Sequence, residues 1–137
     1  MDNPVFFTVL ASDSDGLSLT DAGILGSRIA AESEAARRHE RLPGLRHVPA
    51  VITIIDQDPA TGTPMPHLAP PNPAGFALAS LSVAEPARRH LVPMPIFDHL
   101  EPAMVAANVA RSRNHERGNN SVRDIVALTL ISHASKD

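Results

Sequence analysis

The stretch from Glu40 to Asp58, ERLPGLRHVPAVITIIDQD, decides how the rest of the sequence is interpreted. A charged helix end gives way, through one Pro-Gly pair, to an apolar run from His47 to Asp56 that is typical of a strand. Almost every residue from 48 to 55 is apolar, whichever way its side chain points. A strand in an antiparallel sheet covered on one side alternates apolar and polar residues instead. The stretch therefore predicts a strand that is buried on both faces.

The flanking sequence predicts further strands and helices. A β-branched and aromatic run predicts a first strand, and capping residues followed by apolar residues at helical spacing predict two helices. Pro43-Gly44 ends the first helix, and Gly118 ends the second. In chain order we expect a strand from Val5 to Ala11, a helix from Ser18 or Thr20 to about Arg41, the strand from His47 to Asp56, a strand from Gly75 to Val83, and a helix from Asp98 to about Arg117.

The last segment, from 122 to 134, fits either a strand or a helix. Ser121 and Asp124 are residue types that cap helices, whereas the run from Ile125 to Ile131 is uncharged and rich in β-branched side chains. A helix of this composition would be apolar all round. We therefore favour a strand over 124–132, and we expect it to pair antiparallel with the first strand.

The order of these elements, β-α-β-β-α-β, predicts a single α+β domain over residues 1–137. With right-handed crossovers it gives a ferredoxin-like antiparallel sheet with both helices on one face. In the usual strand order, 4-1-3-2, the second strand lies at an edge, where Pro49 is tolerated. The face away from the helices is also apolar, and no spare segment covers it. We therefore expect a homodimer that forms through the sheet, as in a dimeric α+β barrel.

Composition excludes several classes of function. A formal net charge of −3 predicts neither a nucleic-acid partner nor an acidic membrane surface, and no apolar run is long enough to span a membrane. There is no cysteine, which excludes disulfides and thiolate sites and is typical of a cytoplasmic protein. The first residues lack the basic start of a signal peptide. Base stacking is not expected either, because the sequence holds four Phe and no Tyr or Trp.

Two motifs in the first half resemble a known family. The run DGLSLTDAG (15–23), followed by a helix and by RLPGLRHV (41–48), is similar to the N-terminal half of EthD-like and related dimeric α+β barrel proteins. The resemblance implies a dimeric barrel, with members that include small-molecule monooxygenases, cyclases and isomerases. These proteins often carry a histidine in the first helix. Here Ser33 and Glu34 lie in that neighbourhood, so the resemblance implies no catalytic histidine there.

Candidate catalytic residues come from the seven histidines. None of them has the HxH or HExxH spacing of a metal site, so we expect no metal and no other cofactor. His47 opens a strand, His90 lies in the irregular connection 84–97, and His99 lies at the start of the second helix. Each could reach a cleft between sheet and helices and act there as a general acid or base. The alternative is that all three are solvated residues at the ends of elements.

Three functions are consistent with these features. The first is a small cofactor-independent enzyme, of the cyclase, isomerase or monooxygenase type, that acts on a small apolar molecule. The second is a non-catalytic dimeric module whose proline-rich loop, residues 57–74, binds a protein partner and is separable from the fold. The third, haem binding, requires an inward-facing histidine and a large pocket.

Overall fold

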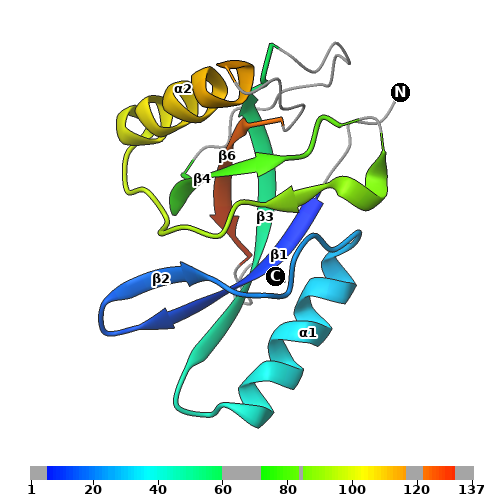
Figure 1. Ribbon diagram of the computed structural model, residues 1–137. Helices are drawn as coiled ribbons and strands as arrows, with labels where there is room; N and C mark the ends of the chain where they lie inside the picture. The colour runs from blue at the N-terminus through cyan, green and yellow to red at the C-terminus, as the bar shows by residue number, and fades with distance from the viewer. Residues whose placement is uncertain (1–5, 60–71, 84, 117–121, 132–137) are drawn as a thin grey trace.

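The computed structural model describes residues 6–59, 72–83, 85–116 and 122–131 (Figure 1). They form an α+β fold in which two helices pack on a curled, six-stranded antiparallel sheet of order β2-β1-β3-β6-β4-β5. The elements are β1 (Phe6–Asp13), β2 (Gly16–Leu19), α1 (Arg28–Arg41), β3 (Arg46–Asp56), β4 (Gly75–Ser80), a 3-10 turn η1 (Pro86–Arg88), β5 (His90–Leu91), α2 (Leu100–Glu116) and β6 (Asp124–Leu130).

The strand order corrects the prediction from the sequence. The last segment is a strand, as expected, but β6 pairs with β3 and β4 and not with β1. The long strands therefore follow the order 1-2-4-3 instead of the ferredoxin-like order 4-1-3-2. The handedness rule used for the prediction governs crossovers between parallel strands. Here each helix follows a short strand, β2 or β5, that the sequence did not predict, and leads to a strand parallel to it on the far side of β1 or β4. Each crossover therefore stays within one half of the chain, and β6 pairs with β3 instead of β1.

Pro49 lies in the central strand β3 and not at an edge. Its neighbour on β1 is Val9, and its carbonyl accepts a hydrogen bond from the amide of Ile131 at 3.0 Å. The last residue of β6 in the ladder is Leu130, opposite Ala50. The amide that proline lacks would point to the side of β6, beyond the point where its ladder ends. A proline here therefore removes a donor only at the end of the pairing between β3 and β6.

The predicted start of the first helix was also wrong, because residues 16–19 form the strand β2. Gly16 has a φ of 117°, which favours glycine and closes the turn between β1 and β2. Leu17 and Leu19 alternate with Ser18, and the leucines pack against the core. Helix α1 begins at Arg28 instead of Ser18 or Thr20. Its cap is Ser27, whose side chain accepts a hydrogen bond from the amide of Ala30.

The chain consists of two halves with the same order of elements. In the first half β1 pairs with β2 and β3, and in the second β4 pairs with β5 and β6. In both β1 and β4, the first strand of each half, the second residue is a phenylalanine. Its backbone pairs with the residue three positions before the helix of the same half. Phe7 pairs with Leu25 at 2.7 and 3.0 Å, and Phe76 pairs with Phe97 at 2.8 and 2.9 Å. The two halves are therefore ββαβ units with the same register.

The halves meet along β3 and β6 with the symmetry of a two-fold axis. Ile52 and Leu128 occupy equivalent positions, opposite the first residues of β1 and β4, and they pair directly with each other. Each pair on one side of this central pair has an equivalent pair on the other side, in which the residues of β3 and β6 have exchanged places. The flanking pairs are Ala50–Leu130, Val51–Thr129, Thr53–Ala127 and Ile54–Val126.

The two faces of the sheet are buried in different ways. Helix α2 buries Ala103 and Ala107 against Leu78 and Ile125, and α1 packs on β1 and β3. The opposite face forms the larger cluster, which is enclosed by the curl of the sheet and by side chains outside the long strands. Its members are Phe6, Leu10, Ala50, Ile52, Ile54, Ala77, Ala79, Leu81, Val126 and Leu128, with Leu17, Leu19, Ile24, Leu91 and Ile96 packed against them.

This enclosure bears on the predicted dimer. The sequence predicts a second subunit because both faces of the strands are apolar, and this apolarity is confirmed. The face away from the helices is nevertheless covered within one chain, since side chains from β2, β5 and the segments that follow them pack over it. Burial of the sheet therefore does not require a partner, and assembly through the sheet stays a prediction.

Candidate functional site: a pocket between the two halves

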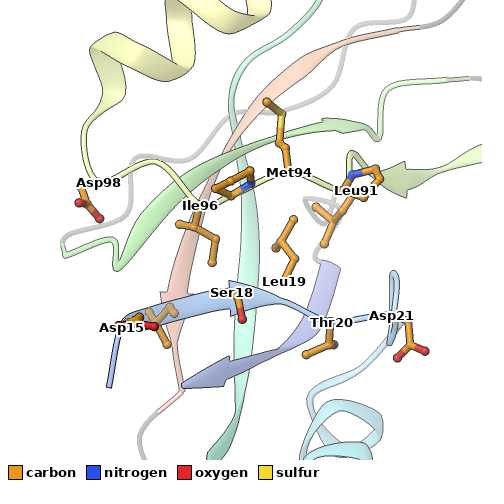
Figure 2. A pocket seen from close by; sticks show the side chains of 13 residues that line it. Asp15, Ser18, Leu19, Thr20, Asp21, Leu91, Met94, Ile96 and Asp98 are labelled. Atoms are coloured by element: carbon orange, nitrogen blue, oxygen red, sulfur yellow. The ribbon is translucent and has the colours of Figure 1, made fainter. Parts of the chain in front are cut away.

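A pocket of about 690 Å³ lies between β2 and the segment that follows β5 (Figure 2). These two walls are the equivalent parts of the two ββαβ halves, so the pocket lies between the halves. In Figure 2, Leu19 on one wall and Leu91 and Ile96 on the other are drawn around the same space. The lining residues are Asp15, Gly16, Leu17, Ser18, Leu19, Thr20, Asp21, Leu91, Pro93, Met94, Pro95, Ile96 and Asp98.

The first wall is held in place by hydrogen bonds at the end of β2. The hydroxyl of Thr20 donates to the carbonyl of Val9 at 2.7 Å and accepts from the amide of Ala22 at 3.2 Å. The chain is thereby tied to β1 as it leaves the strand. Leu19 then lies half-buried between the pocket and the core, directly opposite Leu10 of β1.

The second wall is an extended segment fixed at both ends. The amide of Val92 donates to the carbonyl of Leu78 at 2.9 Å, and Phe97 pairs with Phe76. Pro93 and Pro95 lie between these anchors and keep the backbone extended, and neither carries an amide donor. This wall therefore presents mainly aliphatic carbon to the pocket.

The charges of the lining are all negative. Asp15, Asp21 and Asp98 belong to it, whereas no lysine, arginine or histidine does. Asp21 forms an ion pair with Arg38 of α1, with 2.7 Å between carboxylate oxygen and guanidinium nitrogen. The hydrogen bond and the positive charge of Arg38 lower the pKa of Asp21 below its usual range. No ion pair involves Asp15 or Asp98 among the described residues.

The three histidines proposed as catalytic lie outside the lining of this pocket. His47 is half-buried on β3, opposite Ala11, and its Nδ1 has no hydrogen-bond partner within the described part of the chain. His90 is exposed, with Nδ1 2.9 Å from the carbonyl oxygen of Arg88. His99 is exposed immediately before α2. None of the three therefore lines this pocket.

A buried carboxylate outside the pocket forms several hydrogen bonds, and sequence analysis predicts no role for it beyond a possible helix cap. Asp124 is fully buried at the start of β6. Its oxygens accept hydrogen bonds from the amides of Asp58, Leu81 and Ser82, each at 2.9 Å, and from the hydroxyl of Ser82. These contacts link β6 to the chain after β3 and after β4. Asp124 is therefore a structural residue whose acceptors are occupied.

The prediction that the loop 57–74 is exposed and separable stays untested for most of its range, and it is wrong for Asp58. Residues 60–71 lie outside the described residues. Asp58, at the start of the range, is buried and accepts a hydrogen bond from the amide of Arg123 at 2.7 Å. The amide of Ala74, at its end, donates to the carbonyl of Leu128 at 2.7 Å. The loop is thus anchored structurally at both ends.

Neither a metal site nor a membrane-spanning helix is found among the residues that the structure describes. They contain no group of three or more His, Asp or Glu side chains that could hold a metal ion. No helix among them has the length and apolarity needed to cross a membrane.

No family model, no curated protein and no solved structure matches the chain. The resemblance to EthD-like proteins stays a prediction that rests on the two short motifs. In the structure, the first of those motifs forms β2 instead of the start of a helix.

Proposed function

We propose that this protein binds a small, mostly apolar molecule, neutral or cationic, in the pocket between its two halves. The observation that supports this proposal is a space of about 690 Å³ with an aliphatic floor and a lining that carries only negative charge. Pockets for small molecules commonly measure about 300–1,000 Å³ and combine apolar walls with a few polar groups. The volume and lining both fall within this description.

The apolar part of the ligand would lie against Leu19, Leu91 and Ile96. These side chains are half-buried, so each still presents carbon to the pocket. Removal of apolar surface from water contributes about 0.8 kcal/mol for each buried methylene group. A hydrocarbon part of about ten carbons would therefore contribute roughly 8 kcal/mol, before the entropic cost of association is subtracted.

The charge of the ligand follows from the carboxylates. Asp15 and Asp98 lie in the lining, and no cation of the lining offsets them. A negative group bound beside them would lose its hydration and meet charges of its own sign. Neutral ligands avoid this cost, and a positive group would be attracted. The pocket thus selects against anions such as phosphates and fatty-acid carboxylates.

No histidine would transfer a proton to or from a ligand in this pocket. His47, His90 and His99 are absent from the lining, and the ionisable groups within it are carboxylates. An enzymatic reaction in this pocket would therefore have to use Asp15, Asp21 or Asp98 as its acid or base.

Binding can be measured by titration with N-phenyl-1-naphthylamine, a neutral probe whose fluorescence rises in apolar surroundings. Leu19→Asp should weaken binding at least about tenfold, because it places a carboxylate on the apolar floor. Leu42→Asp is the matched control, since Leu42 is exposed and lies outside the lining. It should bind the probe as the unmodified protein does.

A charge reversal tests the selectivity. Asp98→Lys should strengthen binding of the anionic probe 8-anilinonaphthalene-1-sulfonate relative to the neutral one. Circular dichroism establishes that each variant is folded. Equal affinities of the Leu19→Asp and Leu42→Asp proteins for the neutral probe would refute the proposal.

A further inference from the structure

Helix α2 exposes an unusual number of large apolar side chains for a surface helix. Four of the seven large hydrophobic side chains that are exposed in the described residues lie on this one helix. Val105 is 59% exposed, and the other three are between 40 and 46% exposed. Scattered apolar side chains are normal on a surface, but a gathered set often marks an interface. The four are Leu100, Met104, Val105 and Val109.

The fold itself does not require these side chains to be apolar, because α1 is polar at the equivalent positions. Both helices bury two alanines four residues apart, Ala31 and Ala35 in α1 and Ala103 and Ala107 in α2. The residues of α1 equivalent to the four apolar residues of α2 are all polar or charged. They are Arg28, Glu32, Ser33 and Arg37, of which Arg28 and Glu32 form an ion pair at 3.0 Å.

The exposed residues of α2 also carry a self-complementary pattern of charge. Glu101, Val105, Val109 and Arg113 are four residues apart and form one ridge along the helix. If two such ridges run antiparallel about a two-fold axis at residue 107, Glu101 of one chain meets Arg113 of the other. Val105 then meets Val109. Each contact occurs twice, as in any isologous interface.

We propose that α2 is a homodimer interface in which two copies of the ridge Glu101–Val105–Val109–Arg113 pack antiparallel. All four side chains are exposed and available in one chain. Neither Glu101 nor Arg113 forms an ion pair with another described residue. The contact places the valines at the centre and opposite charges at both ends. One helix pair buries less surface than a permanent dimer, so the association is reversible.

This interface lies on the opposite side of the sheet from the larger core cluster, and α2 contributes no residue to the lining of the pocket. Assembly and ligand binding are therefore separate properties. The dimer also differs from the one predicted by the sequence, which used the sheet face that the chain covers itself.

Sedimentation velocity over a range of concentrations tests the proposal. The unmodified protein should show a reversible monomer–dimer equilibrium. Glu101→Arg alone and Arg113→Glu alone should each be monomeric, because each places like charges together at both ends. An equimolar mixture of these two variants should form a heterodimer, since every end then pairs a positive with a negative side chain. A parallel contact would also be recovered on mixing, but it would place like charges together in the unmodified dimer. Dimerisation of the unmodified protein together with recovery on mixing therefore identifies the antiparallel contact.

Val105→Asp provides the apolar test, and Ser33→Asp, at the equivalent position of α1, is its matched control. Val105→Asp should weaken dimerisation at least about tenfold, and Ser33→Asp should leave it unchanged. Thermal unfolding followed by circular dichroism shows whether each variant is folded. A protein that remains monomeric at all concentrations overturns the proposal. So does a Val105→Asp dimer of unchanged affinity, or a mixture of charge variants that fails to associate.

Discussion

At the scale of single residues, we expect the buried side chain of Asp124 to contribute strongly to the free energy of unfolding. Both carboxylate oxygens accept backbone hydrogen bonds, Oδ1 from Asp58 and Oδ2 from Leu81 and Ser82. In Asp124→Asn, either orientation of the amide would turn an NH₂ group toward a backbone donor. Because a buried donor without an acceptor is costly, we expect the free energy of unfolding to fall by about 3 kcal/mol.

Urea unfolding followed by circular dichroism measures this loss. Asp13→Asn is the control, since Asp13 is exposed and its side chain accepts one hydrogen bond, from the amide of Asp15 at 2.8 Å. That variant should stay within about 0.5 kcal/mol of the unmodified protein. Equal stabilities of the two variants would show that the Asp124 contacts contribute little.

Asp21 gives a prediction of pH dependence. The hydrogen bond from Arg38 lowers the pKa of Asp21, so the folded state favours the carboxylate. The stabilisation is present above the pKa of Asp21 in the unfolded chain, and it is lost as pH falls through the lower pKa of the folded state. In Arg38→Gln the pKa of Asp21 should rise toward its usual value. An NMR titration of the side-chain carboxyl carbon measures this change.

Arg37→Gln is the matched control for this titration. Arg37 is the neighbour of Arg38 on α1, and its ion pair is with Glu34, at 2.9 Å, and not with Asp21. The pKa of Asp21 should therefore be the same in Arg37→Gln and in the unmodified protein. A midpoint that moves equally in both variants would indicate a general effect of charge instead of the specific hydrogen bond.

At the scale of elements, β6 shows how differently two neighbouring leucines contribute. The sequence gives Leu128 and Leu130 equal weight, since both belong to one apolar run. In the structure Leu128 is fully buried at the centre of the sheet, whereas Leu130 is 40% exposed. We expect Leu128→Ala to lower the free energy of unfolding by about 3–4 kcal/mol, and Leu130→Ala by less than about 1 kcal/mol. Chemical denaturation measures both, and a similar loss in the two variants would contradict this account.

The elements that could be predicted are those with a local signal. The apolar runs at 46–56 and 124–130 identify strands, and a helix was expected in each half. The strand β2 was missed although Leu17 and Leu19 alternate with Ser18, because the alternation spans only four residues and competes with helix-capping residue types. Local preference could not decide between these alternatives, since the side chains that pack against Leu19 come from strands far away in the sequence.

At the scale of the whole molecule, strand pairing and the pocket could not be predicted for the same reason. The residues Asp124–Leu130 contain no local signal that identifies β3 and β4 as the neighbours of β6. Strand pairing depends instead on long-range contacts among several apolar strands. The pocket is formed by two segments about 70 positions apart, and neither has a recognisable motif. The histidines were proposed because of their residue type and location at the ends of elements, and those criteria carry no information about three-dimensional position.

The two-fold relation between the halves has a consequence for the history of the chain. A polypeptide of half this length that paired with its own copy along one central strand would build the same six-stranded sheet and the same pocket. Joining two copies into one gene would free each copy to change independently. The present differences have this character: α2 exposes apolar side chains at positions where α1 is polar, and the buried carboxylate Asp124 has Val48 as its counterpart. Divergence after such a fusion would explain how a symmetric frame holds an asymmetric surface.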